Sequence, residues 1–164
     1  MIVLYVFLVL ISCLVLYYLK NGAIYLPTSS GRIDQIIHFA NIKNGTKVVD
    51  LGSGDGRIVI AMAKAGAIAT GFEINPILVW WARFKIWRAG LSDNAKIYSK
   101  NFWNQDLGDY QVIVVFGMTH IMARLEKKIQ KELSKESIVI SYIFKFPNLP
   151  LSFSEQGVHV YKML

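Results

Sequence analysis

The chain has 164 residues, the size of one domain that can bury a real core. Its 18 basic and 11 acidic side chains give a net charge of +7, a balance that suits an anionic partner, either nucleic acid or an anionic membrane surface. The single cysteine, Cys13, excludes an intramolecular disulfide, and the sequence has no cluster of Cys and His residues, so we predict no metal site.

The chain begins with an apolar segment. Residues 1–19, MIVLYVFLVLISCLVLYYL, carry no charged side chain and would reach ~28 Å as a helix, about the thickness of a hydrocarbon core. A cleaved signal peptide is the main alternative, but no Lys or Arg precedes the run and no small-x-small cleavage site ends it. We therefore predict a transmembrane anchor over 1–20, with membrane lipid as a partner. All Lys and Arg follow residue 19, which predicts a catalytic domain on the cytoplasmic side, or on the matrix side if the membrane is mitochondrial.

Residues 21–46 are predicted to form a linker and an N-terminal helix. The stretch KNGAIYLPTSSGR is rich in turn and cap residues, and Ser30 is placed to cap a helix over 31–42. The remaining residues, 47–164, then form the main domain.

Strand and helix patterns alternate from residue 47 onward. The predicted elements, in chain order, are strand 47–51, helix 56–65, strand 68–74, helix 76–89, strand 95–99, strand 111–116, helix 119–134, strand 137–144 and a last strand from residue 158. The run QVIVVF at 111–116 is nearly all apolar, as in a strand covered on both faces. This order predicts an α/β fold with a doubly wound, mostly parallel sheet whose ligand lies at the carboxyl ends of the strands.

The turn after the first of these strands, DLGSGDG, indicates which cofactor the fold binds. Gly52, Gly54 and Gly56 allow a tight turn and a close approach to a ligand. Their spacing differs from the G-x-G-x-x-G of dinucleotide sites, and the carboxylates of Asp50 and Asp55 would repel a phosphate. Such carboxylates suit S-adenosylmethionine, whose amino acid end carries an ammonium. A nicotinamide or flavin site is the alternative, and the absence of G-x-x-x-x-G-K-[ST] excludes a P-loop.

Glu73 ends the second strand of this unit, 21 residues after Gly52. A carboxylate at this position can accept hydrogen bonds from both ribose hydroxyls of an adenosine. The order of strand, glycine turn, helix, strand and terminal acid therefore predicts a cofactor site. The alternative is a structural glycine-rich turn whose acidic residues have no role in binding.

These motifs resemble those of class I S-adenosylmethionine-dependent methyltransferases. GSGDGRIVI and E-x-NP-x-L-V-W, together with NFW at 101–103, VFG at 115–117 and FKFP at 144–147, are similar to a smaller family of membrane-anchored protein-lysine methyltransferases. That family includes the enzymes for the c-subunit of mitochondrial ATP synthase and for the adenine nucleotide translocase, with shorter prokaryotic relatives. The resemblance runs from about Tyr25 to Pro147 and implies a Rossmann-like class I methyltransferase fold with S-adenosylmethionine as cofactor.

The resemblance also implies which residues hold the cofactor. Its methionine end would be lined by Asp50, Gly52, Ser53 and Gly54. Glu73 would hold the ribose, and Tyr25 and Thr28 would belong to a segment that folds over the cofactor.

The adenine would lie against a second group of residues. Ile74 would pack on the ring, and Asn75 would shape the same wall. Asn101, next to Phe102, stands where the family commonly has an aspartate that accepts from the adenine amine, and an asparagine can accept through its carbonyl oxygen.

The methyl acceptor is expected at the ends of two later strands. Methyl transfer from a sulfonium is an in-line displacement that depends mostly on positioning. Phe116 and Gly117 are placed to guide a neutral lysine amine, with Tyr142 and Phe144 as further candidates. The alternative for these aromatics is ordinary core packing. His120 follows a strand end, but we expect it on the first turn of a helix, facing solvent or the backbone.

Three functions are compatible with these sequence features. The first is methylation of lysine on a protein at or in the membrane, and the second is methylation of a membrane-soluble small molecule such as a quinone or a lipid. The third, a non-catalytic docking module, is disfavoured because the cofactor motif is intact. A nucleic-acid methyltransferase is disfavoured because FGMT stands where such amino-methylating enzymes carry N-P-P-[YF]. The helix predicted at 76–89 also carries four large aromatics with three basic residues, which indicates either membrane or partner contact or core packing.

Overall fold

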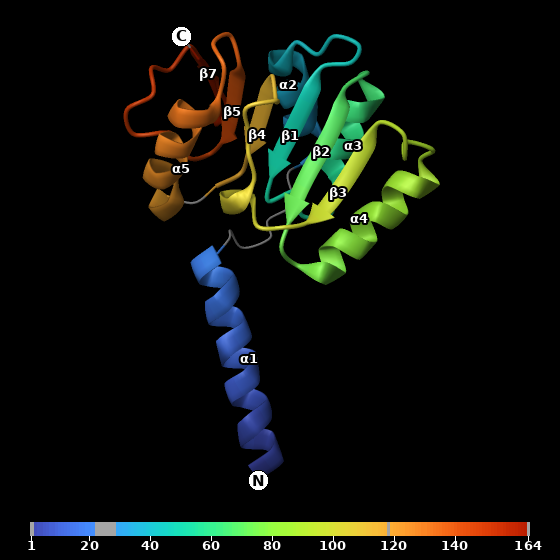
Figure 1. The fold of residues 1–164 in the computed structure, drawn as a ribbon, viewed down its shortest axis with the longest axis vertical. Helices are drawn as coiled ribbons and strands as arrows, with labels where there is room; N and C mark the ends of the chain where they lie inside the picture. The colour runs from blue at the N-terminus through green and yellow to red at the C-terminus, as the bar shows by residue number, and fades with distance from the viewer. Residues whose placement is uncertain (1, 22–28, 118, 164) are drawn as a thin grey trace.

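The computed structural model describes residues 2–21, 29–117 and 119–163, with side chains in the first segment given for residue 2 and residues 4–13. A seven-stranded sheet lies at the centre of the domain (Figure 1). Its strands are β1 (Lys47–Leu51), β2 (Ile68–Glu73), β3 (Ala95–Ser99), β4 (Val112–Val115), β5 (Ile138–Tyr142), β6 (Phe153–Glu155) and β7 (Val158–Lys162). The helices are α1 (Ile2–Asn21), α2 (Ser30–Ala40), α3 (Arg57–Lys64), α4 (Pro76–Arg88) and α5 (Thr119–Glu132), with a 3-10 turn, η1, at Phe102–Asn104.

The sheet has the order β3-β2-β1-β4-β5-β7-β6. Strands β1 to β5 run parallel, while β7 is antiparallel to β5 and β6 is antiparallel to β7. The prediction of a doubly wound, mostly parallel sheet is therefore confirmed. The winding reverses between β1 and β4, and ligands of such sheets bind at the carboxyl ends of the strands beside that reversal.

Two apolar layers cover the two faces of the sheet. Alternate residues of β1 divide between them, with Val48 on one side and Val49 on the other. The first layer contains buried residues of α2, α3 and α4, and the second contains those of α5. A strand buried on both faces requires apolar side chains on both sides, as seen here. The helices cover the two faces of the sheet, and its carboxyl edge is left free for a site.

Several boundaries differ from the sequence prediction. Strand β5 ends at Tyr142 because the next residue, Ile143, has φ 69°, which breaks the extended conformation. The first helix of the domain begins at Ser30, one residue early, and its N-cap is Ser29, which makes no side-chain cap hydrogen bond. The short strand β6 was not predicted, since its FSE sequence shows no apolar run.

The structure does not support the predicted transmembrane anchor over 1–20. Residues 2–21 do form a helix, and its side chains at 2 and 4–11 are exposed and apolar. Within the part of the chain that the structure describes, however, no helix is both long and apolar enough to cross a membrane.

Candidate functional site

The glycine turn leaves β1 at the carboxyl edge of the sheet. Gly52, Gly54 and Gly56 have φ values of 83°, 52° and 75°, a region that favours glycine. The turn is tied to β2, because the backbone N–H groups of Gly52 and Ser53 donate to the carbonyl of Phe72 at 2.9 and 3.0 Å. A Cβ on Gly56 would lie 2.9 Å from that of Ala82, so the turn also packs closely against α4.

Glu73 fastens the end of β2 to this turn. Its Oε2 accepts from the N–H of Gly54 at 2.9 Å, and its Oε1 accepts from the N–H groups of Ile74 and Asn75 at 2.8 Å each. A carboxylate has about four acceptor sites, so these three bonds hold it in place without exhausting it. The predicted ribose acid therefore lies beside the glycine turn in a fixed orientation.

Asp50 is the buried acid of the site. Burial raises its pKa to about 8, and the nearby charges of Glu73 and Asp55 add to the shift. Among the described residues, its carboxyl group has no hydrogen-bonded or ion-pair partner. A ligand that brought a positive charge to this carboxyl would compensate it, as the ammonium of an amino acid would do.

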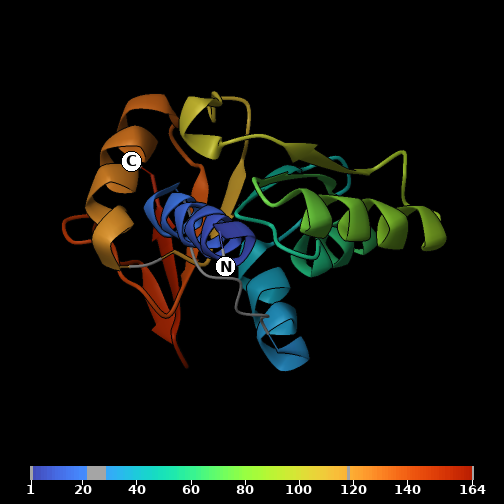
Figure 2. The same cartoon turned by 90° about the horizontal axis from the view of Figure 1, so that it is seen from below.

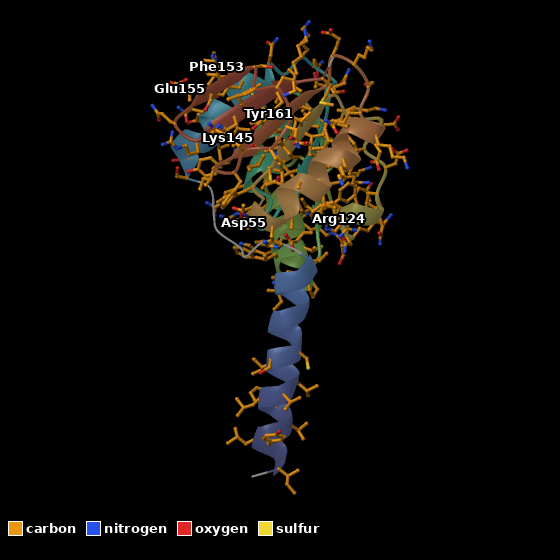
Figure 3. All side chains as sticks on the ribbon, turned by 90° about the vertical axis from the view of Figure 1, so that its left-hand side faces the viewer. Asp55, Arg124, Lys145, Phe153, Glu155 and Tyr161 are labelled. Atoms are coloured by element: carbon orange, nitrogen blue, oxygen red, sulfur yellow. The ribbon has the colours of Figure 1, made fainter. Side chains whose placement is uncertain are left out.

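Asp55, by contrast, is already neutralised. Its carboxylate pairs with Arg57 at 2.9 Å and with Lys85 of α4 at 2.7 Å. Burial alone would raise its pKa, but the bonds and charges of these two cations outweigh burial and lower the pKa to about 2. Figure 3 shows Asp55 at the end of the domain from which α1 extends. The sequence did not reveal this role, since Lys85 lies 30 residues away along the chain.

Three residues predicted to contact the cofactor have local structural roles. Asn75 is the N-cap of α4, where its Oδ1 accepts from the N–H of Ile77 at 3.0 Å. Asn101 is the N-cap of η1 and accepts from the N–H of Trp103 at 3.0 Å. Phe102 is buried in the apolar layer around α5. An asparagine before Pro76 is a helix-start signal that could have been read from the sequence.

The remaining cofactor predictions have different outcomes. The hydroxyl of Ser53 is buried and has no hydrogen-bond partner among the described residues. It faces β2, because a Cβ added to Gly71 would lie 2.5 Å from it. Ile74 is half-buried beside Glu73. Tyr25 and Thr28 lie outside the described residues.

Aromatic rings gather at the ends of β4 and β5. The Phe116 ring lies 5.0 Å from that of Tyr142 and 6.3 Å from that of Phe144, and all three are half-buried. Gly117 is buried, and a Cβ there would meet the Sδ of Met122 at 2.6 Å, so this glycine lets α5 approach. The structure thus brings together the aromatics that the sequence proposed for the acceptor.

An unusual backbone conformation sets two of these rings in place. Ile143, between Tyr142 and Phe144, has φ 69°, a costly region for a β-branched residue, and half of its surface is exposed. Its N–H donates to the carbonyl of Gly157 at 2.7 Å, and its carbonyl accepts from Nε2 of His159 at 3.3 Å. Strain of this kind concentrates at functional sites.

His159 supports that turn from the neighbouring strand β7. Since a carbonyl only accepts, Nε2 carries the proton, and Nδ1 lies 2.8 Å from the hydroxyl of Ser154. The sequence offered no partner for this histidine, because the pairing depends on β6 and on the turn after β5. His120 is exposed on the first turn of α5, as predicted.

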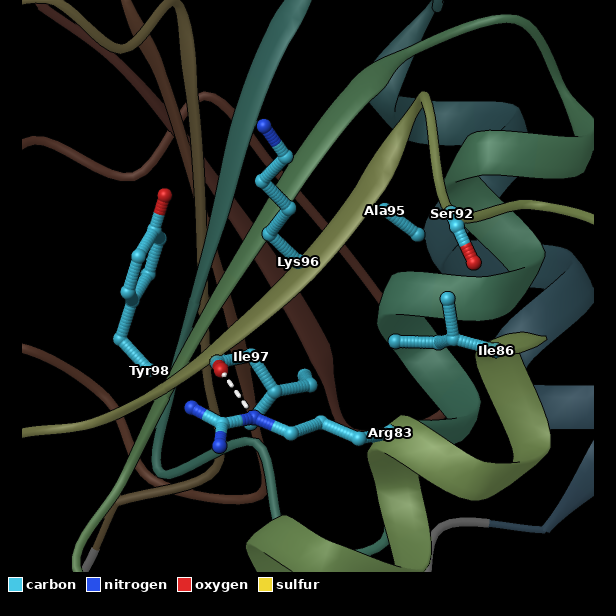
Figure 4. Close-up of a pocket in the computed structure, with 7 residues that line it drawn as sticks. All are labelled: Arg83, Ile86, Ser92, Ala95, Lys96, Ile97 and Tyr98. Carbon is cyan, nitrogen blue, oxygen red and sulfur yellow. Dashed lines mark hydrogen bonds between the residues drawn. The ribbon is translucent and has the colours of Figure 1, made fainter.

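A separate cavity of about 220 Å³ lies between α4 and the edge strand β3. Its lining includes Arg83, Lys96 and Tyr98, and none of the predicted site residues (Figure 4). Arg83 donates from Nε to the carbonyl of Ile97 at 2.9 Å and so covers part of the open edge of the sheet.

Comparison with known proteins agrees with this geometry. The model of the ANTKMT methyltransferase domain family matches residues 50–152. This chain belongs to that family. The lysine N-methyltransferase of the ATP synthase c-subunit from Homo sapiens is 40% identical over 76% of this chain, and the adenine nucleotide translocase lysine N-methyltransferase of Mus musculus is 38% identical over 75%. The family predicted from the motifs is confirmed.

The chain spans about half the length of these curated relatives, 53% and 54%. A protein-lysine N-methyltransferase of Saccharolobus islandicus is 32% identical, with 74% of this chain and 76% of the relative covered. Among solved structures, an RNA methyltransferase from Salinibacter ruber with bound S-adenosyl-L-homocysteine has a TM-score of 0.78 at 28% identity, covering 84% of this chain and 92% of its own. The ANTKMT-family chain therefore has the Rossmann-like class I methyltransferase fold.

Proposed function

We propose that this chain is an S-adenosylmethionine-dependent methyltransferase that acts on lysine side chains of a protein. The observation that carries the proposal is Asp50, a buried carboxyl without a cationic partner among the described residues, beneath a glycine turn to which Glu73 is fixed. A cofactor with an ammonium at one end and ribose hydroxyls in the middle fits both groups. Family membership and the complex of the Salinibacter neighbour with S-adenosyl-L-homocysteine support the same cofactor.

The residues of the site would act mainly by positioning. When bound, S-adenosylmethionine supplies a methyl group on a positively charged sulfur. Asp50 would pair with the ammonium of the cofactor, and Glu73 would accept from its ribose hydroxyls. Among the described residues, no atom lies within 4 Å of a Cβ added to Gly52, so the backbone there can be approached closely. Such positioning can supply on the order of 7–11 kcal/mol of a barrier.

The aromatic group at the ends of β4 and β5 would receive the acceptor. Lysine attacks as a neutral amine, and the half-buried rings of Phe116, Tyr142 and Phe144 would disfavour its charged form. The names of relatives that are 32% to 42% identical support a lysine acceptor.

The acceptor is proposed to lie at a membrane. The helix α1 exposes apolar side chains at 2 and 4–11, which would bind lipid and hold the domain near membrane-bound substrates. The relatives named for the ATP synthase c-subunit and for adenine nucleotide translocase support a protein acceptor of this kind.

Transfer of a radioactive methyl group tests this proposal. The full chain is incubated with tritiated S-adenosylmethionine and with membranes from cells lacking it, and the label is then measured in protein, lipid extract and nucleic acid. Label in protein that disappears with Asp50→Ala supports the proposal. Label in the lipid extract alone would favour the quinone or lipid alternative, and absence of label from all fractions would favour a non-catalytic module.

A further inference from the structure

The helix α4 is apolar on both of its sides. Toward the sheet it buries Val79, Ala82 and Ile86. Its outward side carries a second apolar row, formed by Ile77, Trp80, Trp81, Phe84 and Trp87. A surface helix normally turns a polar face to water, and a helix that is apolar all round is normally covered on both sides.

The outward row is open to solvent. Trp80 and Trp87 are 67% and 69% exposed, and Ile77 is 75% exposed. The Phe84 ring stacks on Trp80 at 6.1 Å and on Trp81 at 5.5 Å, and lies 6.0 Å from Trp87. Figures 1 and 2 show α4 at the margin of the domain. A contiguous exposed patch of this kind marks an interaction surface.

Charge around this row favours an anionic partner. The segment 74–105 carries one acidic residue, Asp93, and five basic residues, which are Arg83, Lys85, Arg88, Lys96 and Lys100. Arg83 lies one helical turn from both Trp80 and Trp87, at spacings of three and four residues. It also lines the cavity between α4 and β3 with Lys96 (Figure 4). Lys85 is engaged by Asp55, which leaves Arg83 and Arg88 as the basic residues of α4 beside the aromatic row.

We propose that the outward face of α4, formed by Ile77, Trp80, Trp81, Phe84 and Trp87 and bordered by Arg83 and Arg88, docks on an anionic lipid surface. Exposed tryptophans between basic residues suit the boundary between headgroups and acyl chains. The first turn of α4 begins at the carboxyl edge of the sheet, on the side from which α1 extends (Figure 1). Docking of α4 would therefore hold the candidate site close to the bilayer independently of α1.

Tryptophan fluorescence of the full chain tests this docking, because α1 contains no tryptophan. One variant keeps Trp87 alone, with Trp80, Trp81 and Trp103 changed to Phe. The matched control has all four changed to Phe and carries Phe153→Trp. Phe153 is 47% exposed on β6, which forms the edge of the sheet opposite β3. In Figure 3 it lies at the end of the domain away from α1. The probe is a vesicle of phosphatidylcholine with phosphatidylserine and brominated acyl chains.

The proposal predicts that Trp87 emission shifts to the blue and is quenched on these vesicles, while emission from the control is unchanged. Arg88→Gln should weaken binding to the vesicles roughly fivefold, and only when phosphatidylserine is present. Quenching of neither tryptophan, or of both equally, would overturn the proposal. A response to an RNA oligonucleotide without a response to vesicles would assign the face to nucleic acid instead. Each of these failures would leave the proposed methyl transfer untouched, since no residue of the cofactor site is altered.

Discussion

Glu73 accepts a hydrogen bond from the backbone N–H of Gly54, with 2.9 Å between the oxygen and the nitrogen. The contact joins the end of β2 to the glycine turn that follows β1, so two strands share one fixed carboxylate. The position of this carboxylate is thus set before any ligand arrives, which is the kind of preorganisation that binding and catalysis reward.

Glu73→Ala should weaken S-adenosylmethionine binding by about 1.5–3 kcal/mol, because a charge-assisted hydrogen-bond acceptor is lost. Calorimetric titration measures the change. Glu73→Gln is the matched control: it keeps a carbonyl oxygen for the ribose and should bind more tightly than the alanine variant. Equal affinity of Glu73→Ala and the unaltered chain would remove Glu73 from the ribose site.

Asp50→Asn should stabilise the cofactor-free chain while weakening cofactor binding. Burial raises the pKa of Asp50 to about 8 from an ordinary value of 3.8, so the folded state binds a proton more tightly than the unfolded state. The free energy of unfolding therefore falls as pH rises from about 4 to 8. The amide side chain of the Asp50→Asn variant does not ionise, so the variant does not lose this stability. Urea unfolding should show that Asp50→Asn is more stable than the unaltered chain at pH 8, and that this gain in stability disappears at pH 4. A gain that does not vary with pH would contradict ionisation as its cause.

Lys85→Met should lower the free energy of unfolding by about 1–3 kcal/mol, because it removes one of two cations from the largely buried Asp55. The pairing lowers the pKa of Asp55 to about 2, so its stabilisation is present above about pH 4 and is lost as pH falls toward 2. The control is Lys162→Met, which breaks an exposed pair with Glu136 and should cost less than ~1 kcal/mol. Equal losses in the two variants would argue against a special role for Asp55.

The Ile143→Gly variant should be more stable than the Ile143→Ala variant by about 1 kcal/mol. This is the reverse of the usual order, in which alanine is the more stabilising residue. Both substitutions remove the half-exposed isoleucine side chain, and only glycine accepts φ 69° without strain. Thermal or urea unfolding of Ile143→Gly and Ile143→Ala gives the comparison. If alanine proves as stable as glycine, the backbone at this turn is not strained in solution.

The sequence predicted the fold well because its signals are local. Strand β4 is an apolar run, and the glycine turn with Glu73 marks one βαβ unit, so the core and the cofactor edge follow from periodicity and spacing. Asn75 was assigned to the cofactor wall although its place before Pro76 is also that of a helix cap. Helix-capping preference and the family motif both single out Asn75, the first for a structural role and the second for cofactor binding.

The features that were missed depend on contacts between distant segments. The ion pair of Asp55 with Lys85, and the contact of His159 with the carbonyl of Ile143, join residues that no local pattern links. The positive φ of Ile143 is equally hidden, since a β-branched residue ordinarily predicts continued strand. The anchor prediction rested on length, apolarity and the absence of signal-peptide features, and among the described residues no helix is long and apolar enough to cross a membrane.

The central claim is that this chain methylates lysine on a protein, and residue-resolved mass spectrometry tests it most directly. Membranes from cells lacking the chain are incubated with S-adenosylmethionine and either the unaltered chain or the Glu73→Ala variant, and their proteins are digested and compared. The account predicts a lysine that gains one or more methyl groups with the unaltered chain, and gains them far more slowly with the variant. Methyl groups found only on lipid, quinone or RNA, with no lysine changed, would contradict it.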